Sequence, residues 1–402
     1  MQNRVKPFPT RAAALAQLSA QTWDLVVIGG GISGAGVAQQ AARRGWSVLL
    51  LEQRDFAWGT SSRSSKLVHG GLRYLKEGDI KTTLHSVRER QRLLHEAPGL
   101  VEPQSFLFAD CPGRKPGRWL MQTGLVVYDL MAGQRSHFYA DLATTQMLAP
   151  GLAPPGLRGA LVFPDAKTDD ARLVWRVLLE AQRDGATLLN YMAVQSLQTA
   201  NGKVTGVVAQ DTLTGEMHTL QARAVVNATG AWSPITASFA GMSPSNARVR
   251  PGKGIHVVYD RRLSNYAISA SAIDGRQVFL EPWQNMTIVG TTDDDYYGDL
   301  DDVRATSEEV RYLVQGVARV FPAIRSARAI GTYAGVRPTL HTFGKYEDDL
   351  SRDHKVIDHA PHGAPNVYSM IGGKLASYRL FAEDMVDVLA QRFDLGVHTT
   401  TH

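Results

Sequence analysis

The chain has 402 residues, which is enough for two or three packed domains with a large buried core. Hydrophobic residues make up 44% and charged residues 20%, a balance that is typical of globular proteins and excludes disordered and fibrous classes. Lys and Arg exceed Asp and Glu by 43 to 38, an excess that suits an anionic substrate or lipid surface but is too dispersed to indicate nucleic acid as a partner.

Two further features concern the cellular compartment. The single cysteine, Cys111, excludes an internal disulfide, and we expect a reducing, cytoplasmic environment. No apolar run reaches the roughly 18 residues that span a bilayer, so any membrane contact is expected at the surface. Residues 1–22 lack the apolar core of a signal peptide and are expected to form an N-terminal extension with a short helix.

The first elements predict a nucleotide-binding unit. Residues 24–28 form a short apolar run typical of a buried parallel strand, and a glycine cluster follows at once. A helix is expected over 35–44 and a second strand over 47–51, which ends at Glu52. Glycines at 29, 31 and 34, with an acidic residue 23 positions after the first of them, match the pattern that holds a dinucleotide.

Later elements extend the same sheet. We expect a helix over about 169–184, a strand over 187–191, and a hairpin that turns at Asn201-Gly202, a pair that favours the primed turns. Further strands are expected over 224–230 and 366–370, and a late helix is expected to begin near Lys374.

The expected fold class is α/β with α+β elements. A Rossmann-like cofactor-binding domain is predicted over 23–69, 161–244 and 331–402, and it is interleaved with a substrate-binding cap built on an antiparallel sheet. The cap is predicted over 70–160 and 245–330, where amphipathic strands alternate with Pro-rich turns.

Residues 60–75 read TSSRSSKLVHGGLRYL, a stretch far more specific than the glycine pattern. It resembles the flavin-proximal loop of the FAD-dependent glycerol-3-phosphate dehydrogenases, which belong to the D-amino-acid-oxidase-like flavoproteins. Further stretches match in the same order along the chain: DDARLV from 169, VNATGAW from 226, KGIH from 253, VGTTD from 289, YAGVRP from 333, SRDH from 351 and GGKLASYR from 372.

Two departures from that family are visible. The family usually carries an additional C-terminal helical domain, whereas this sequence is expected to lack it because it ends soon after the late helix. Ala376-Ser377 also stands where the family generally has a pair of threonines.

The resemblance implies FAD as the cofactor, with the glycine turn on its pyrophosphate and Glu52 on the adenosine ribose. A helix after the late glycine turn would stabilise negative charge on the reduced flavin. The full set of implied cofactor contacts is Gly29, Gly31, Ile32, Ser33, Gly34, Glu52, Gln53, Thr60, Ser61, Ser62, Ser65, Lys66, His69, Gly71, Val194, Ala228, Gly230, Trp232, Gly373, Lys374 and Leu375.

The resemblance also implies a phosphorylated polyol as substrate. Four cations are expected to converge on a dianionic phosphate, with Tyr74 beside them: Arg73, Arg337, Arg352 and Lys374. His256 is the candidate base for the substrate hydroxyl, although a lone histidine is more often structural. Arg337 and Lys374 are counted with it as catalytic candidates, since Arg337 can polarise the developing carbonyl.

The expected activity is oxidation of sn-glycerol 3-phosphate to dihydroxyacetone phosphate, with electrons passed to quinone or another acceptor. Oxidation of a 2-hydroxy acid or an amine stays open as the alternative, and so does a non-catalytic flavoprotein. No metal site is expected, because the late histidines lack ligand spacing. Residues 114–128 combine basic, aromatic and apolar side chains, so a peripheral contact with the cytoplasmic membrane face stays open beside a plain covering helix in water.

Overall fold

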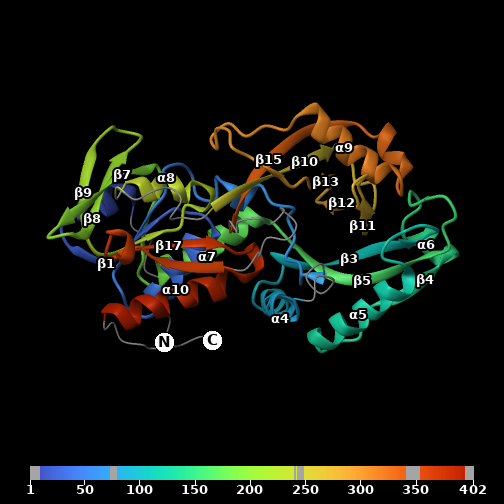
Figure 1. Ribbon diagram of the computed structural model, residues 1–402, viewed down its shortest axis with the longest axis horizontal. Helices are drawn as coiled ribbons and strands as arrows, with labels where there is room; N and C mark the ends of the chain where they lie inside the picture. Colours follow the sequence, from blue (N-terminus) through green and yellow to red (C-terminus); the bar gives the residue numbers. More distant parts are fainter. Residues whose placement is uncertain (1–9, 73–78, 240, 242–248, 341–353, 394–402) are drawn as a thin grey trace. The chain divides into compact units, whose positions relative to one another are not determined.

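The computed structural model describes residues 10–72, 79–239, 241, 249–340 and 354–393. The chain divides into two compact units, each assembled from separated segments (Figure 1). Unit 1 comprises residues 1–62, 170–252 and 337–402, and unit 2 comprises residues 63–169 and 253–336. The residues after Ser62 fall in unit 2, where Leu67 pairs with Lys167 of a neighbouring strand.

Unit 1 is built on a sheet whose central strands are parallel. Its strands are β1 (Thr22–Ile28), β2 (Val48–Leu51), β6 (Thr187–Leu189), β7 (Met192–Ala200), β8 (Lys203–Asp211), β9 (Met217–Asn227), β16 (His354–Asp358) and β17 (Val367–Gly372). The order is β16-β17-β9-β1-β2-β6, and the β7–β8 hairpin joins through β8 and β9. Four pairs are parallel, as expected of a doubly wound fold, and β16 runs antiparallel at the edge.

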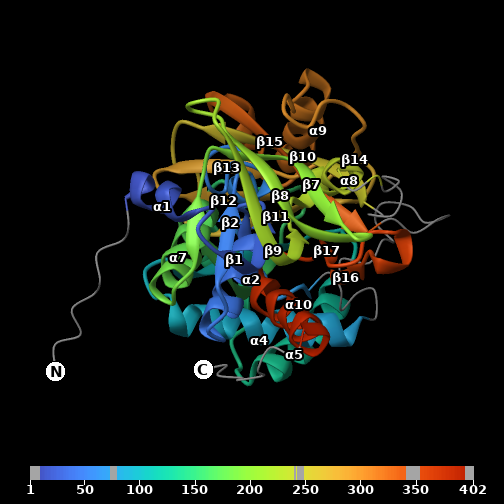
Figure 2. The same ribbon diagram turned by 90° about the vertical axis from the view of Figure 1, so that its left-hand side faces the viewer.

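Helices flank this sheet. The α-helices of unit 1 are α1 (Arg11–Gln17), α2 (Ile32–Arg43), α7 (Asp170–Arg183), α8 (Ser233–Ser238) and α10 (Tyr378–Phe393), with short 3-10 turns at η1 (Thr60–Ser62), η2 (Gly230–Trp232), η6 (Ala360–His362) and η7 (Leu375–Ser377). Figure 2 shows α10 beside α2. Because Gly36 of α2 has no side chain, α2 can pack closely against Tyr378 and Ala382 of α10. On the other side of α2, Arg43 forms ion pairs with Glu180 of α7 and with Asp184, which follows α7.

Unit 2 is built on a second, largely antiparallel sheet. Its strands are β3 (Val101–Asp110), β4 (Phe138–Asp141), β5 (Gly159–Thr168), β10 (Val249–Tyr259), β11 (Ala267–Ser271), β12 (Gln277–Trp283), β13 (Met286–Gly290), β14 (Asp294–Asp295) and β15 (Ala329–Leu340). The order is β14-β10-β13-β12-β11-β3-β5-β4, and β11 and β3 run parallel within it.

The two faces of this sheet are covered by different helices (Figure 1). The helices of unit 2 are α4 (Ile80–Glu96), α5 (Arg118–Ala132), α6 (Leu142–Leu148) and α9 (Ser307–Ala318), followed by the 3-10 turn η4 (Pro322–Ser326). Leu313 and Val317 of α9 pack on Ile255 and Leu280. Met121 and Leu125 of α5 pack on aromatic side chains of the opposite face, where alternation along the strands directs Phe106 and Phe163.

Candidate active site

The glycine turn of unit 1 has the shape that the sequence predicts. β1 ends at Ile28, and α2 begins at Ile32 with Gly31 as its N-cap, so the first amides of α2 face the turn without a capping side chain at that position. A Cβ atom on Gly34 would overlap the carbonyl oxygen of Gly29, and one on Gly29 would lie 2.8 Å from the carbonyl oxygen of Ala228. Only glycine therefore allows the strand, the turn and the helix to meet this closely.

Glu52 and Ser61 hold the outer side of that turn. The amides of Gly30 and Arg54 donate to the Glu52 carboxylate at 2.7 and 2.9 Å. Burial raises the pKa of Glu52, and the amide donors act in the opposite direction. The amide of Ile32 donates to Oγ of Ser61 at 3.0 Å, which brings η1 to the start of α2.

These residues fit the pyrophosphate and ribose of a dinucleotide. At Gly29 and Gly34 a Cβ atom would meet backbone, and the N-terminus of α2 supplies the donors and positive dipole end that favour phosphate. Each oxygen of the Glu52 carboxylate has two acceptor positions, so the carboxylate can still bind ribose hydroxyls while it holds the two amides.

The other expected cofactor contacts of unit 1 are spread over several elements. Ala228 and Gly230 follow β9, and Trp232 closes η2, where its ring lies 6.1 Å from that of Trp58. Thr60 and Ser62 share η1 with Ser61, whereas Gln53 is exposed. Val194 is buried in β7, and Ile32 and Ser33 form the first turn of α2.

The late glycine turn differs from the sequence-based expectation in one respect. Gly372 and Gly373 both have positive φ, and Lys374 is the N-cap of the 3-10 turn η7, which begins at Leu375. The helix expected near Lys374 therefore starts there as a 3-10 turn and continues as the α-helix α10 from Tyr378. The amide of Ser377 donates to the carbonyl of Lys374, which closes the tighter turn.

In unit 2, His256 is the centre of a compact cluster of polar and aromatic side chains. It lies on β10 with 2% of its surface exposed, and its Nε2 atom is 2.9 Å from Oγ of Ser65. Its ring stacks on Tyr333 with the centroids 4.6 Å apart. On its neighbouring strand, a Cβ atom on Gly290 would overlap the imidazole, so the ring is confined from both sides.

Lys66 belongs to the same cluster. Its backbone has the left-handed φ of 59°, which is uncommon for a residue with a side chain. Its Nζ atom lies 5.5 Å from the ring centre of Trp283 and 5.6 Å from that of Tyr333. The Tyr333 hydroxyl donates to the carbonyl of Ser64 at 2.9 Å, so one tyrosine joins the loop, the lysine and His256.

Several site residues expected from the sequence are not part of the cluster around His256. Arg73, Tyr74 and Arg352 lie outside the described residues. His69 and Gly71 follow Lys66 in unit 2, while Arg337 on β15 and Lys374 belong to unit 1. Tyr333 and Trp283 were given no role from the sequence; Tyr333 stands in a quoted motif, but nothing in the linear pattern indicates that it stacks on a histidine 77 positions earlier.

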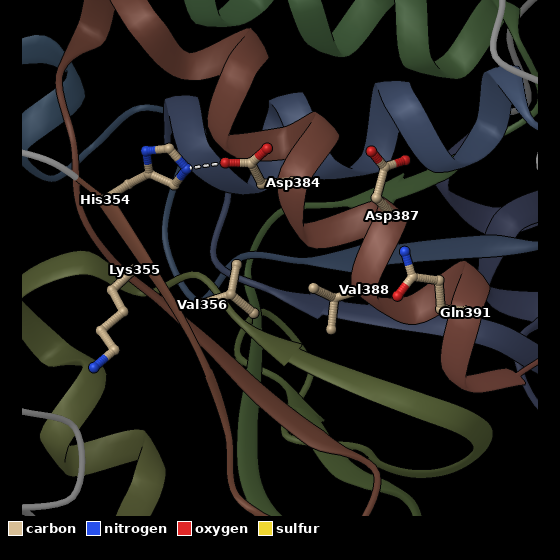
Figure 3. Close-up of a pocket in the computed structure, with 7 residues that line it drawn as sticks. All are labelled: His354, Lys355, Val356, Asp384, Asp387, Val388 and Gln391. Atoms are coloured by element: carbon tan, nitrogen blue, oxygen red, sulfur yellow. Dashed lines mark hydrogen bonds and ion pairs between the residues drawn. The ribbon is translucent and has the colours of Figure 1, made fainter. Parts of the chain in front are cut away.

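A separate pocket of about 420 Å³ lies on unit 1 between β16 and α10 (Figure 3). The His354 ring is hydrogen-bonded to the Asp384 carboxylate there, and Asp387 and Gln391 line the same side. None of the site residues expected from the sequence lines this pocket, so we assign it no part in cofactor or substrate binding.

Comparison with known proteins identifies the family of this chain. Residues 24–379 match the model of a family described as FAD dependent oxidoreductase. Among curated relatives, the chain is 38% identical to a glycerol-3-phosphate dehydrogenase of Synechocystis over 91% of its length, and 36% identical to an aerobic glycerol-3-phosphate dehydrogenase of Bacillus subtilis over 95%. In both cases it spans 69% of the relative.

Solved structures agree with this placement. A glycerol-3-phosphate dehydrogenase of Bacillus halodurans complexed with FAD superimposes with a TM-score of 0.77 at 32% identity, covering 96% of this chain and 67% of that one. A glycine oxidase of Geobacillus kaustophilus superimposes with a TM-score of 0.67 at 19% identity and shows the fold alone. The family expected from the motifs is therefore confirmed, and the chain belongs to the FAD-dependent oxidoreductases of the DAO family.

Proposed function

We propose that this protein oxidises sn-glycerol 3-phosphate to dihydroxyacetone phosphate and passes the electrons to quinone or another acceptor. The observation that carries the proposal is the relatedness to proteins named glycerol-3-phosphate dehydrogenase, at 35 to 38% identity over more than nine tenths of the chain. Neighbours that act on amino acids are similar in fold but share less than 20% of their sequence with this chain.

FAD would be held by the glycine turn, Glu52 and Ser61, and when bound it supplies the ring that accepts a hydride from the substrate carbon. His256 is the proposed base that takes the proton of the substrate hydroxyl. The contact between its Nε2 atom and Ser65 supports this, because a partner on one ring nitrogen restrains the orientation of the ring.

The proposed phosphate anchors are Arg73, Arg337, Arg352 and Lys374. Guanidinium groups bind phosphate oxygens through paired, charge-assisted hydrogen bonds, and several of them favour a dianion over a carboxylate or an amine. Arg337 is also proposed to polarise the developing carbonyl, which requires that its substitution affects the reduction rate as well as binding.

A peripheral contact with anionic lipid is supported by the outer face of α5. Trp119, Leu120 and Leu130 are 73%, 70% and 77% exposed, and further exposed apolar side chains follow on β4 and α6 at Phe138, Leu142 and Met147.

Cations flank these apolar side chains. Lys115 precedes the helix and is exposed, and the Arg118 guanidinium stacks on Tyr139. Exposed Trp and Leu flanked by cations suit the headgroup region of a membrane, where quinone is reached. Within the described residues, no helix is long and apolar enough to cross a bilayer.

Anaerobic reduction of the bound flavin tests the substrate. The oxidised flavin band is expected to bleach when glycerol 3-phosphate is added and to persist with glycerol, with inorganic phosphate and with glycine. Bleaching by 2-hydroxy acids or amines in place of glycerol 3-phosphate would establish the alternative activity. A flavin band unaffected by all of these compounds, yet bleached by dithionite, would contradict a dehydrogenase of either kind.

A further inference from the structure

A short segment of unit 2 determines where Ser65 meets His256. The segment Lys66–Gly70 runs antiparallel to the end of β5: the amide of Val68 donates to the carbonyl of Ala166 at 2.9 Å, and the amide of Thr168 donates to the carbonyl of Lys66 at 2.8 Å. Ser65 directly precedes this segment and lies 2.9 Å from the His256 ring. A shift of the segment along β5 would therefore move Ser65 relative to the ring of His256, the proposed base.

Asp165 fastens the far end of this segment. Its side chain is buried on β5, and the amide of Gly70 donates to Oδ1 at 3.0 Å. The guanidinium of Arg90 on α4 donates to the same oxygen at 3.0 Å. Burial raises the pKa of Asp165, while the Arg90 charge and the hydrogen bonds act to lower it. Because both charged groups are buried, neither has water as a ready substitute for its partner.

Tyr128 on α5 completes the arrangement from the other side. Its hydroxyl accepts a hydrogen bond from Arg90 at 2.7 Å and lies 3.5 Å from Oδ2 of Asp165. A Cβ atom on Gly70 would overlap that hydroxyl and lie 2.8 Å from Cζ of the ring. The tyrosine is thus a wall against which the Gly70 backbone rests.

We infer that Asp165, Arg90 and Tyr128 are positioning residues for the substrate side of the active site. They hold the Gly70 amide between a buried carboxylate and a phenol, and so fix the register of the Lys66–Gly70 segment on β5. The inference rests on the proposed function for the identity of the substrate, but the positioning itself does not depend on which substrate is oxidised.

A pair of substitutions at the wall tests the inference in the flavin-loaded protein. Gly70→Ala should displace the segment and lower kcat/KM for glycerol 3-phosphate by about 10- to 100-fold, since misplacement of about 1 Å is this costly in an active site. Adding Tyr128→Phe removes the overlapping oxygen, and it should restore part of that loss. Rescue would show that the Tyr128 hydroxyl sets the position of the Gly70 backbone. Unchanged kcat/KM in Gly70→Ala, or a double variant no more active than Gly70→Ala, overturns the role of Tyr128.

The carboxylate is tested against a matched control. Asp165→Asn should slow flavin reduction and speed amide exchange in the peptide 66–72, measured by mass spectrometry. The control is Asp110→Asn on β3. Like Asp165, Asp110 lies near a tyrosine and an arginine: it accepts a hydrogen bond from the Tyr139 hydroxyl at 3.1 Å and lies near Arg118. This substitution should change neither measurement. Equal loss of melting temperature in both variants, with unchanged exchange and unchanged reduction rate, overturns the inference.

The two proposals fail in different ways. If the unsubstituted protein is bleached by a 2-hydroxy acid or an amine and not by glycerol 3-phosphate, the proposed substrate is wrong and the same variants are compared with the compound that works. If no compound bleaches the flavin, amide exchange in residues 66–72 still decides whether Asp165 and Tyr128 fix the segment.

Discussion

The Nε2 atom of His256 and the Oγ atom of Ser65 lie 2.9 Å apart, although 191 positions separate the two residues. Tyr333 covers one side of the imidazole and Gly290 leaves room for it on the neighbouring strand. A histidine confined in this way has a defined orientation, which a base must have before it can take a proton from a bound alcohol.

His256→Gln is expected to slow the anaerobic reduction of the flavin by roughly 100- to 10,000-fold, the range by which a positioned general base accelerates proton transfer. Ser65→Ala should cost about tenfold, because one hydrogen bond that orients the ring is lost. Stopped-flow absorbance follows both rates. Bound FAD should be unchanged in the His256 variant, and a reduction rate equal to that of the unsubstituted protein would show that His256 is structural.

Gly34→Ala is expected to abolish retention of FAD, because its Cβ atom would overlap the carbonyl oxygen of Gly29 and push α2 away from the glycine turn. The ratio of flavin to protein absorbance after gel filtration measures this. Gly124→Ala is the control: it lies within α5, has no heavy atom near the added methyl, and should raise stability by about 0.5 to 1 kcal/mol. Normal flavin content in the Gly34 variant would contradict the assignment of the cradle.

His359 is expected to make the protein sensitive to acid. Burial, with a smaller effect of His362, lowers the pKa of His359 to about 4, and Nε2 lies 2.8 Å from Oγ of Ser369. In the unfolded chain a histidine takes up its proton near pH 6.5. Stability is therefore expected to fall as the pH is lowered from about 6.5 towards 4, because the unfolded state binds the proton first. His359→Gln should flatten the melting temperature over this interval, whereas His85→Gln, at an exposed position, should not.

Glu281 is expected to lower the stability of the protein as the pH rises, opposite to the effect of His359. It is buried on β12, and burial, together with the nearby Asp165, raises its pKa well above the usual value. Its contribution is fully present below about pH 4.5, where the carboxyl is protonated in both states, and is lost as the pH rises through the raised pKa. Glu281→Gln should therefore increase the melting temperature at pH 8 and change it little at pH 4. The same substitution at the exposed Glu308 gives the reference, and an identical pH profile for both variants would contradict this account.

The outer face of α5 is expected to bind vesicles of phosphatidylglycerol and to bind phosphatidylcholine weakly, because cations flank its exposed apolar side chains. Leu120→Glu combined with Leu130→Glu should abolish sedimentation with the vesicles and leave the reduction of a water-soluble dye unchanged. Leu213→Glu places the same charge on an exposed leucine of unit 1 and should sediment normally. Equal binding of all three proteins would exclude this face as the lipid contact.

The nucleotide-binding unit could be predicted because its signals are local. The expected strands 24–28 and 47–51 correspond to β1 and β2, and the turn at Asn201-Gly202 has the two positive φ angles, 51° and 71°, that this pair favours. Hydrophobic runs and turn residues specify such elements within a few positions of the chain, and tertiary packing does not oppose them here.

What could not be predicted depends on distant contacts. The Gly70 amide reaches Asp165 across 95 positions, and Arg90 belongs to a third segment, so no spacing in the sequence indicates their meeting. The 3-10 form of the first turn of the late helix could not be predicted for a different reason: a 3-10 turn and an α-helix favour the same residues, and the bond from the Ser377 amide to the Lys374 carbonyl distinguishes them.

The strand order of unit 1 also constrains how the protein is made. β9 lies between β1 and β17, and β8 pairs only with its first half on the β17 side. Residues 225–227 of β9 therefore have no partner on that flank until β17 has left the ribosome. All residues of unit 2 have by then been synthesised, since that unit ends at Val336. The nascent chain therefore carries a short unpaired strand edge at the end of β9 late in synthesis, next to the glycine turn that follows β1, and this edge is exposed to wrong pairing until β17 covers it.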